Sequence, residues 1–267
     1  MSPQPPKQYQ TMSPTTPPPA QSSALPPAHP FNTNPTSQAE PAPQPTHKIT
    51  PQRKPLLRLE LRDLSSAGSH AFLRLTHASH ALEHAIDTVL QHLYTGLDAS
   101  TCIPGTRSVT LVLRAMDGVA YTTGLALDDD HKEIHLNTTY LAHVPEPRQK
   151  EEILGVLVHE MVHCWQHSGC GSAPVGLTEG VADWVRLKAG LAPPHWKRRG
   201  DCEWDAGYER TGYFLEWLEG VCGGDVVRRI NEGLRVGRYD GDGLWRTCCG
   251  KSVEELWEAY KKSLECV

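Results

Sequence analysis

Proline is distributed so unevenly along this chain that it divides the sequence into two parts. Sixteen of the 22 prolines lie in residues 1–55, and only six lie in the 212 residues that follow. Proline is excluded from helix interiors and central strands, so the first part is poorly suited to regular structure. It is also rich in Gln, Ser and Thr, with a single phenylalanine, and cannot bury enough apolar surface to offset its ordering entropy. We therefore predict a disordered, Pro-rich segment over residues 1–54 and one folded domain over residues 55–267.

The predicted domain is acidic. The whole chain has a net charge of −5; residues 1–54 contribute four basic residues and one acidic residue, which leaves 22 basic and 30 acidic residues, or −8, for the rest. Such a domain has little attraction for nucleic acid or anionic lipid. No run of 18 apolar residues occurs, and the first residues lack the apolar core of a secretory signal. We expect a monomer with no nucleic-acid or membrane partner, cytoplasmic by default, although eight cysteines would suit an oxidising compartment.

The order of hydrophobic patterns predicts an α+β domain, because strand-like segments come first and helical segments follow. β-Branched or alternating segments predict strands, and longer apolar periodicities predict helices. The expected strands cover residues 56–61, 108–113, 119–122 and 133–137, with a turn at residues 128–130. The expected helices cover about residues 68–95, 148–167, 176–189, 205–220, 223–233 and 252–264.

Two histidines and a glutamate stand at a spacing that suits a metal centre within the helix expected over residues 148–167. His159 and His163 are four residues apart, so their rings lie on one helix face and can converge on one ion. Glu160 lies beside them, where a carboxylate can accept a proton from a water molecule acidified by zinc. We predict that the histidines bind Zn²⁺ and that Glu160 acts as general base. A chance occurrence of the motif among 14 histidines is the alternative.

The next predicted helix offers a third ligand. Glu179 and Asp183 are again four residues apart, so Glu179 can complete the zinc site if the two helices pack together. Asp183 can then accept the free ring N–H of a ligating histidine. An exposed acidic pair on a surface helix is the alternative. His167 is excluded, because it lies about 12 Å along the axis from His159, whereas two donors on one zinc ion are at most about 4 Å apart.

Several other residues are weaker candidates for a catalytic or metal-binding role. His77, His80 and His84 have helical spacing and could form a second metal site, but we interpret them as the polar face of an amphipathic helix. Cys164 points about 100° away from the preceding ligand around the helix, which indicates a structural thiol. All seven tryptophans lie in the last 103 residues, and we expect most of them in the core of the helical half, with one available to shape a cleft.

An ordered series of motifs resembles the basic secretory protein family of plants, which also occurs in fungi and bacteria and is grouped with the zinc metallopeptidases. The matching segments are residues 133–137, 159–166, 176–188, 204–208, 213–218 and 251–257. The resemblance implies a zincin-like fold with a small mixed sheet, a long zinc-binding helix, a helical C-terminal half and a glutamate as third ligand. The family name describes basic, secreted proteins, whereas the domain of this chain is acidic and its first residues lack a secretory signal. An extracellular location is therefore implied by the family name alone.

The resemblance also implies how a substrate binds. Peptidases of this fold add an extended substrate to an edge strand, and the matching segment is about residues 133–137; an ordinary sheet strand fits that segment equally well. Hydrolysis also needs a donor for the oxyanion. Tyr208 is the first candidate and Tyr213 the second, although a tyrosine in a Trp-rich helix can serve packing alone.

We therefore expect a zinc-dependent endopeptidase that acts on peptide or protein substrates. One alternative is a catalytically silent binding or defence protein that keeps the fold. Another is a scaffold in which the Pro-rich segment recruits partner domains.

Overall fold

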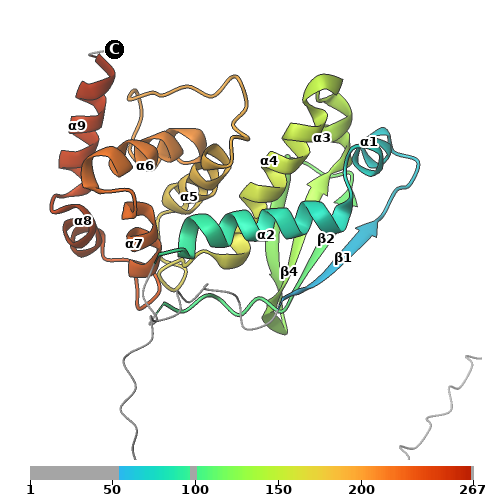
Figure 1. The fold of residues 1–267 in the computed structure, drawn as a ribbon, viewed down its shortest axis with the longest axis horizontal. Helices are drawn as coiled ribbons and strands as arrows, with labels where there is room; N and C mark the ends of the chain where they lie inside the picture. Colours follow the sequence, from blue (N-terminus) through green and yellow to red (C-terminus); the bar gives the residue numbers. More distant parts are fainter. Residues whose placement is uncertain (1–53, 97–100, 266–267) are drawn as a thin grey trace, which may run out of the picture. The chain divides into compact units, whose positions relative to one another are not determined.

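The computed structural model describes residues 54–96 and 101–265, and these residues form an α+β domain around a four-stranded mixed sheet (Figure 1). The strand order is β1-β2-β4-β3; β1, β2 and β4 are parallel to one another, and β3 runs antiparallel to β4. The prediction of an α+β fold with a small mixed sheet is confirmed. The prediction of disorder lies outside the described residues, apart from residue 54. The strands are β1 (Leu56–Leu61), β2 (Ser108–Arg114), β3 (Ala120–Leu125) and β4 (Asp128–Asn137).

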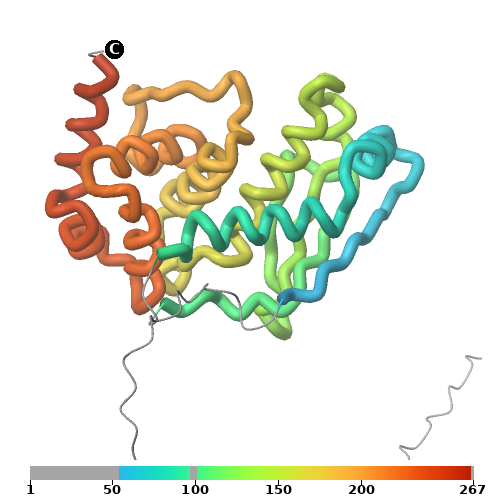
Figure 2. Tube along the Cα trace, viewed as in Figure 1, coloured from blue at the N-terminus to red at the C-terminus, as the bar shows by residue number. Residues whose placement is uncertain are grey.

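The helices form a layer against the sheet and a separate helical half beside it (Figures 1 and 2). Helices α2 and α4 pack against each other, α2 also contacts β1, and α4 also contacts β3 and β4. None of the described helices combines the length and apolar character needed to cross a membrane. The helices are α1 (Ala67–Leu75), α2 (Ala78–Tyr94), α3 (Thr138–His143), α4 (Glu146–Trp165), α5 (Val175–Lys188), α6 (Tyr208–Cys222), α7 (Val226–Gly233), α8 (Gly241–Cys249) and α9 (Val253–Glu265).

Helix α4 is the central element of the domain. Thirteen of its 20 residues are buried, because it lies between the sheet, α2 and α5. Pro145 precedes the helix and Pro147 lies in its first turn, where a missing N–H costs no helical hydrogen bond. The histidine motif therefore occupies the boundary between the sheet and the helical half.

The helix expected over residues 68–95 is wrong in one respect, because the structure divides it into α1 and α2. The backbone N–H and the hydroxyl of Thr76 both donate to the Phe72 carbonyl, which ends α1. The two helices also have different partners: α1 packs against α3, and α2 packs against α4. An apolar periodicity that continues through Thr76 gives no sign of this change of direction.

The predicted edge strand is also wrong. Residues 133–137 belong to β4, which lies between β2 and β3. Residues 128–130 are not a turn but the start of β4, where Arg107 pairs with Asp128 and Lys132 with Asp129. The edge strand on the α4 side is therefore β3, and its unpaired edge is the one available to an added strand.

Candidate metal centre

Three side chains from α4 and α5 converge on one point. His159 Nε2 lies 3.3 Å from His163 Nε2 and 3.1 Å from Glu179 Oε2, and His163 Nε2 lies 3.7 Å from Glu179 Oε1. Nitrogen or oxygen donors about 2.1 Å from a tetrahedral zinc ion are roughly 3.4 Å apart. The three residues thus form a group that could hold a metal ion, and the spacing of their donor atoms fits zinc.

Each imidazole of this group has a second partner on its far side. His159 Nδ1 lies 2.6 Å from Asp183 Oδ1, and Asp183 is almost completely buried. His163 Nδ1 lies 2.6 Å from the side-chain amide of Gln166, the residue that caps α4. Partners of this kind fix the ring orientation and direct the Nε2 atoms toward the convergence point. Asp183 was expected in this role from its spacing to Glu179, whereas Gln166 was not expected, because its only sequence signal is its position three residues after His163.

The charges of the group shift its titration in the metal-free protein. Burial alone would lower the pKa of His159, but hydrogen bonds to Asp183 and Glu179 outweigh it and raise the pKa to about 10. Burial alone would raise the pKa of Glu179, but hydrogen bonds to His159 and His163 hold this pKa far below its ordinary value. The site therefore favours positive charge at its centre, whether from a proton or from a metal ion.

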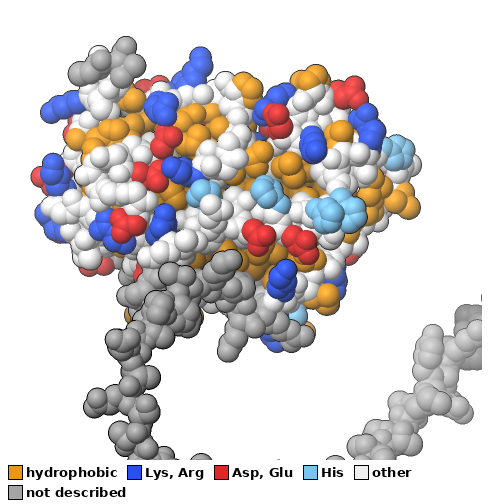
Figure 3. All heavy atoms as spheres, in the orientation of Figure 1, with side chains coloured by type: hydrophobic (Ala, Val, Ile, Leu, Met, Phe, Trp, Pro, Cys, Tyr) orange, Lys and Arg blue, Asp and Glu red, His pale blue; other side chains and the backbone are white. Residues whose placement is uncertain are grey.

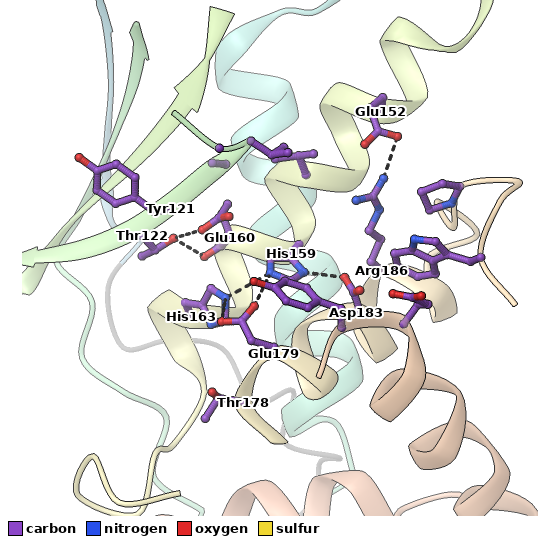
Figure 4. Close-up of a pocket in the computed structure, with 18 of the residues that line it drawn as sticks. Tyr121, Thr122, Glu152, His159, Glu160, His163, Thr178, Glu179, Asp183 and Arg186 are labelled. Carbon is purple, nitrogen blue, oxygen red and sulfur yellow. Dashed lines mark hydrogen bonds and ion pairs between the residues drawn. The ribbon is translucent and has the colours of Figure 1, made fainter. Parts of the chain in front are cut away.

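Glu160 lies beside the convergence point and faces the sheet. The residue is 5% exposed, and the Thr122 hydroxyl on β3 lies 2.7 Å from Glu160 Oε2 and 2.9 Å from its backbone carbonyl (Figure 4). The carboxylate thus sits between the three donor residues and the edge strand. Thr122 is a second residue that the sequence analysis missed, because the contact joins residues 38 positions apart.

A cleft of about 800 Å³ exposes this group to the surface. Tyr208 lies at its rim, 56% exposed, with its ring stacked 6.1 Å from that of His159. The charge of Glu179 raises the pKa of Tyr208. Gly176 on α5 allows the turn before α6 to lie close to α5, since a Cβ at Gly176 would lie 1.6 Å from the Asp205 carbonyl in that turn. Tyr213 is buried beside Arg198 and does not line the cleft.

A buried ion pair forms the far end of the same cleft. Arg186 on α5 donates to Glu152 on α4 at 2.9 Å (Figure 4). The Tyr140 hydroxyl donates to the same carboxylate at 2.8 Å. The guanidinium also lies 5.2 Å from the centre of the Trp196 ring. A Cβ on Gly155 would lie 2.5 Å from Arg186 Nε, so this glycine makes room for the guanidinium against α4.

The remaining candidate residues lie outside the convergence point. The His167 ring donates through Nε2 to the Cys102 carbonyl at 3.2 Å, away from the three donors of the convergence point. His80 and His84 on α2, and His77 just before it, are exposed and form no metal-binding group among the described residues. Figure 3 shows histidines among charged side chains of both signs on the face that it draws. Cys164 is buried, and its burial raises the thiol pKa. Most tryptophans are buried as expected, whereas Trp196 lines the cleft.

Comparison with known proteins decides the family. A family model described as "Peptidase of plants and bacteria", abbreviated BSP, matches residues 54–260. The chain belongs to this family. The resemblance to the basic secretory proteins is thereby confirmed, and BSP membership makes the chain a peptidase, at the level of the family's description, with peptides or proteins as substrates. No curated protein and no solved structure matches the chain significantly.

Proposed function

We propose that this BSP-family chain is a zinc-dependent endopeptidase. The observation that carries the proposal is the convergence of three donor atoms from His159, His163 and Glu179, all within 4.8 Å of one another, beside the buried carboxylate of Glu160. Two imidazoles and one carboxylate are a donor set that zinc peptidases use, and they leave one position for water. A zinc ion held there would lower the pKa of a water molecule and polarise the scissile carbonyl.

The side chains around the donors suit the remaining tasks of peptide hydrolysis. Glu160 would accept the proton of the attacking water and then deliver it to the leaving amine. Asp183 would hold the His159 ring in the orientation that presents Nε2 to the metal. Tyr208 would donate a hydrogen bond to the oxyanion, because its phenol lies at the rim of the cleft with its ring 6.1 Å from that of His159.

The course of the cleft supports cleavage within a chain rather than at its end. Besides the donors, its lining includes Thr178 and Ser168, and Tyr140 and Pro193. The unpaired edge of β3 borders it through Ala120–Thr122. An extended peptide could pair with this edge, in the antiparallel or parallel sense, and pass the donors without ending there.

Substitution of Glu160 by Gln tests the proposal directly. The E160Q variant should bind one zinc ion as the native protein does but lose at least about 100-fold in kcat, the low end of what general-base catalysis contributes. Zinc content by elemental analysis and cleavage of a mixed peptide library measure the two properties. E151Q is a matched control, because Glu151 lies on the exposed face of the same helix.

Chelation provides the second arm of the experiment. Activity should disappear on removal of zinc and return when zinc is restored. Stoichiometric zinc with no cleavage of any peptide by the native chain would instead favour the silent binding protein. Full activity of E160Q would end the proposed mechanism.

A further inference from the structure

Thr122 is the residue through which the edge strand contacts the candidate general base. On β3 it stands opposite the fully buried Ile134 of β4, so its side chain points toward the helices. Its neighbours Tyr121 and Thr123 are exposed on the opposite face of the sheet. The Thr122 hydroxyl reaches both Glu160 Oε2 and the Glu160 carbonyl, at 2.7 Å and 2.9 Å.

The Glu160 carboxylate has few other restraints. Within residues 54–96 and 101–265, Thr122 provides the hydrogen bond made to this carboxylate, and no Lys or Arg forms an ion pair with it. A glutamate side chain has three rotatable bonds, and a catalytic group that samples several orientations loses much of the advantage of proximity. One hydroxyl that spans the carboxylate and the backbone of the same residue limits that freedom.

We propose that Thr122 is a positioning residue, which holds the Glu160 carboxylate toward the cleft and ties it to the strand that borders the substrate. This inference rests on the proposed zinc peptidase function and deepens it. Because the Thr122 backbone lies on the edge strand and its hydroxyl lies on the general base, a peptide that pairs with β3 and the group that activates water share one rigid support. The contact thereby sets the distance between the scissile bond and the base.

Three substitutions separate the hydroxyl from the rest of the side chain. T122V keeps the volume and removes the hydroxyl, T122S keeps the hydroxyl and removes a methyl group, and T122A removes both. A displaced catalytic group costs up to about 100-fold in rate, so T122V and T122A should lower kcat by about 10- to 100-fold. KM and zinc content should change little, and T122S should keep most of the native kcat.

A purely structural role predicts a different pattern. If Thr122 only packs β3 against α4, then T122S should be impaired as much as T122A, and the loss should appear in KM and in thermal stability. T123V is the matched control, since Thr123 is adjacent but exposed on the other face; its kinetics should match the native protein.

The outcomes distinguish this inference from the proposed function. Lack of cleavage by the zinc-loaded native protein would overturn the proposed function itself. An active native protein whose T122V and T122A variants keep native kcat would overturn only the role of Thr122. If T122V does not fold, the comparison of T122S with T122A still decides, because these two variants differ by the hydroxyl alone.

Discussion

The two ends of the α4–α5 interface contain buried charges, but only one end is neutral. At the far end of the cleft, Arg186 and Glu152 form a pair whose side chains are 7% and 10% exposed. At the near end, the carboxylates of Glu160, Glu179 and Asp183 surround two imidazoles. The formal charge of the first set is zero, and that of the second is −3 when the imidazoles are neutral.

This difference separates charges that the chain itself neutralises from charges that it leaves unbalanced. The Arg186–Glu152 pair obtains its partners from the chain itself, including the Tyr140 hydroxyl and the Leu191 carbonyl. The near end lacks a fixed Lys or Arg partner among the described residues, so its carboxylates favour a positive charge at the centre, from a proton or from a metal ion. A buried ionic group that the protein neutralises completely indicates architecture, whereas one left anionic in an open cleft indicates a binding site.

The largest effect should come from breaking the neutral pair. Replacing Arg186 by Met leaves the Glu152 carboxylate buried without its main partner, which should lower the free energy of unfolding by about 3–5 kcal/mol. Urea denaturation measures this change. The double variant R186M/E152Q should recover part of the loss, and zinc stoichiometry should remain one in both variants. Loss of zinc in R186M at temperatures where it is folded would contradict the separation of the two ends.

The next effect should come from the partners of the two imidazoles. Asp183→Asn removes the charge that orients His159 and should weaken zinc binding by about 10- to 100-fold. Gln166→Leu removes a neutral partner of His163, and its effect should be smaller, below about 10-fold. Competition with a chromophoric chelator measures both affinities. Equal losses in the two variants would show that the charge of Asp183 adds nothing to its position.

The core of this site was accessible to sequence reasoning because helical spacing is local. Residues four apart on one helix lie on one face whatever surrounds them, so the His159 and His163 pair and the Glu179 and Asp183 pair could each be recognised in isolation. That the two helices pack together was inferred from the chemistry, since two histidines alone leave a zinc site incomplete. The structure brings all four residues together.

The errors and omissions concern contacts between distant segments. The alternation of polar and apolar residues predicts a strand but not its neighbours in the sheet. The resemblance assigned the edge strand to residues 133–137, whereas β3 occupies that edge. The acidic start of β4 read as a turn because its cation partners, Arg107 and Lys132, were not evident. Thr122 was unremarkable in sequence, and only the packing of β3 on α4 reveals its contact with Glu160.

The third effect is the pH dependence of the metal-free protein. The pKa of His159 is raised from 6.5 to about 10 in the folded state, so its stabilisation is complete below about pH 6.5 and is lost as pH rises toward 10. The pKa of Glu179 is lowered from 4.5, so its contribution is present above about pH 4.5 and is lost as pH falls. The metal-free protein should therefore be most stable between about pH 4.5 and 6.5, as measured by thermal unfolding in a chelator.

Zinc should remove the decline in stability at high pH, because His159 then binds metal instead of a proton. A decline that is the same with and without zinc would show that His159 is not a ligand.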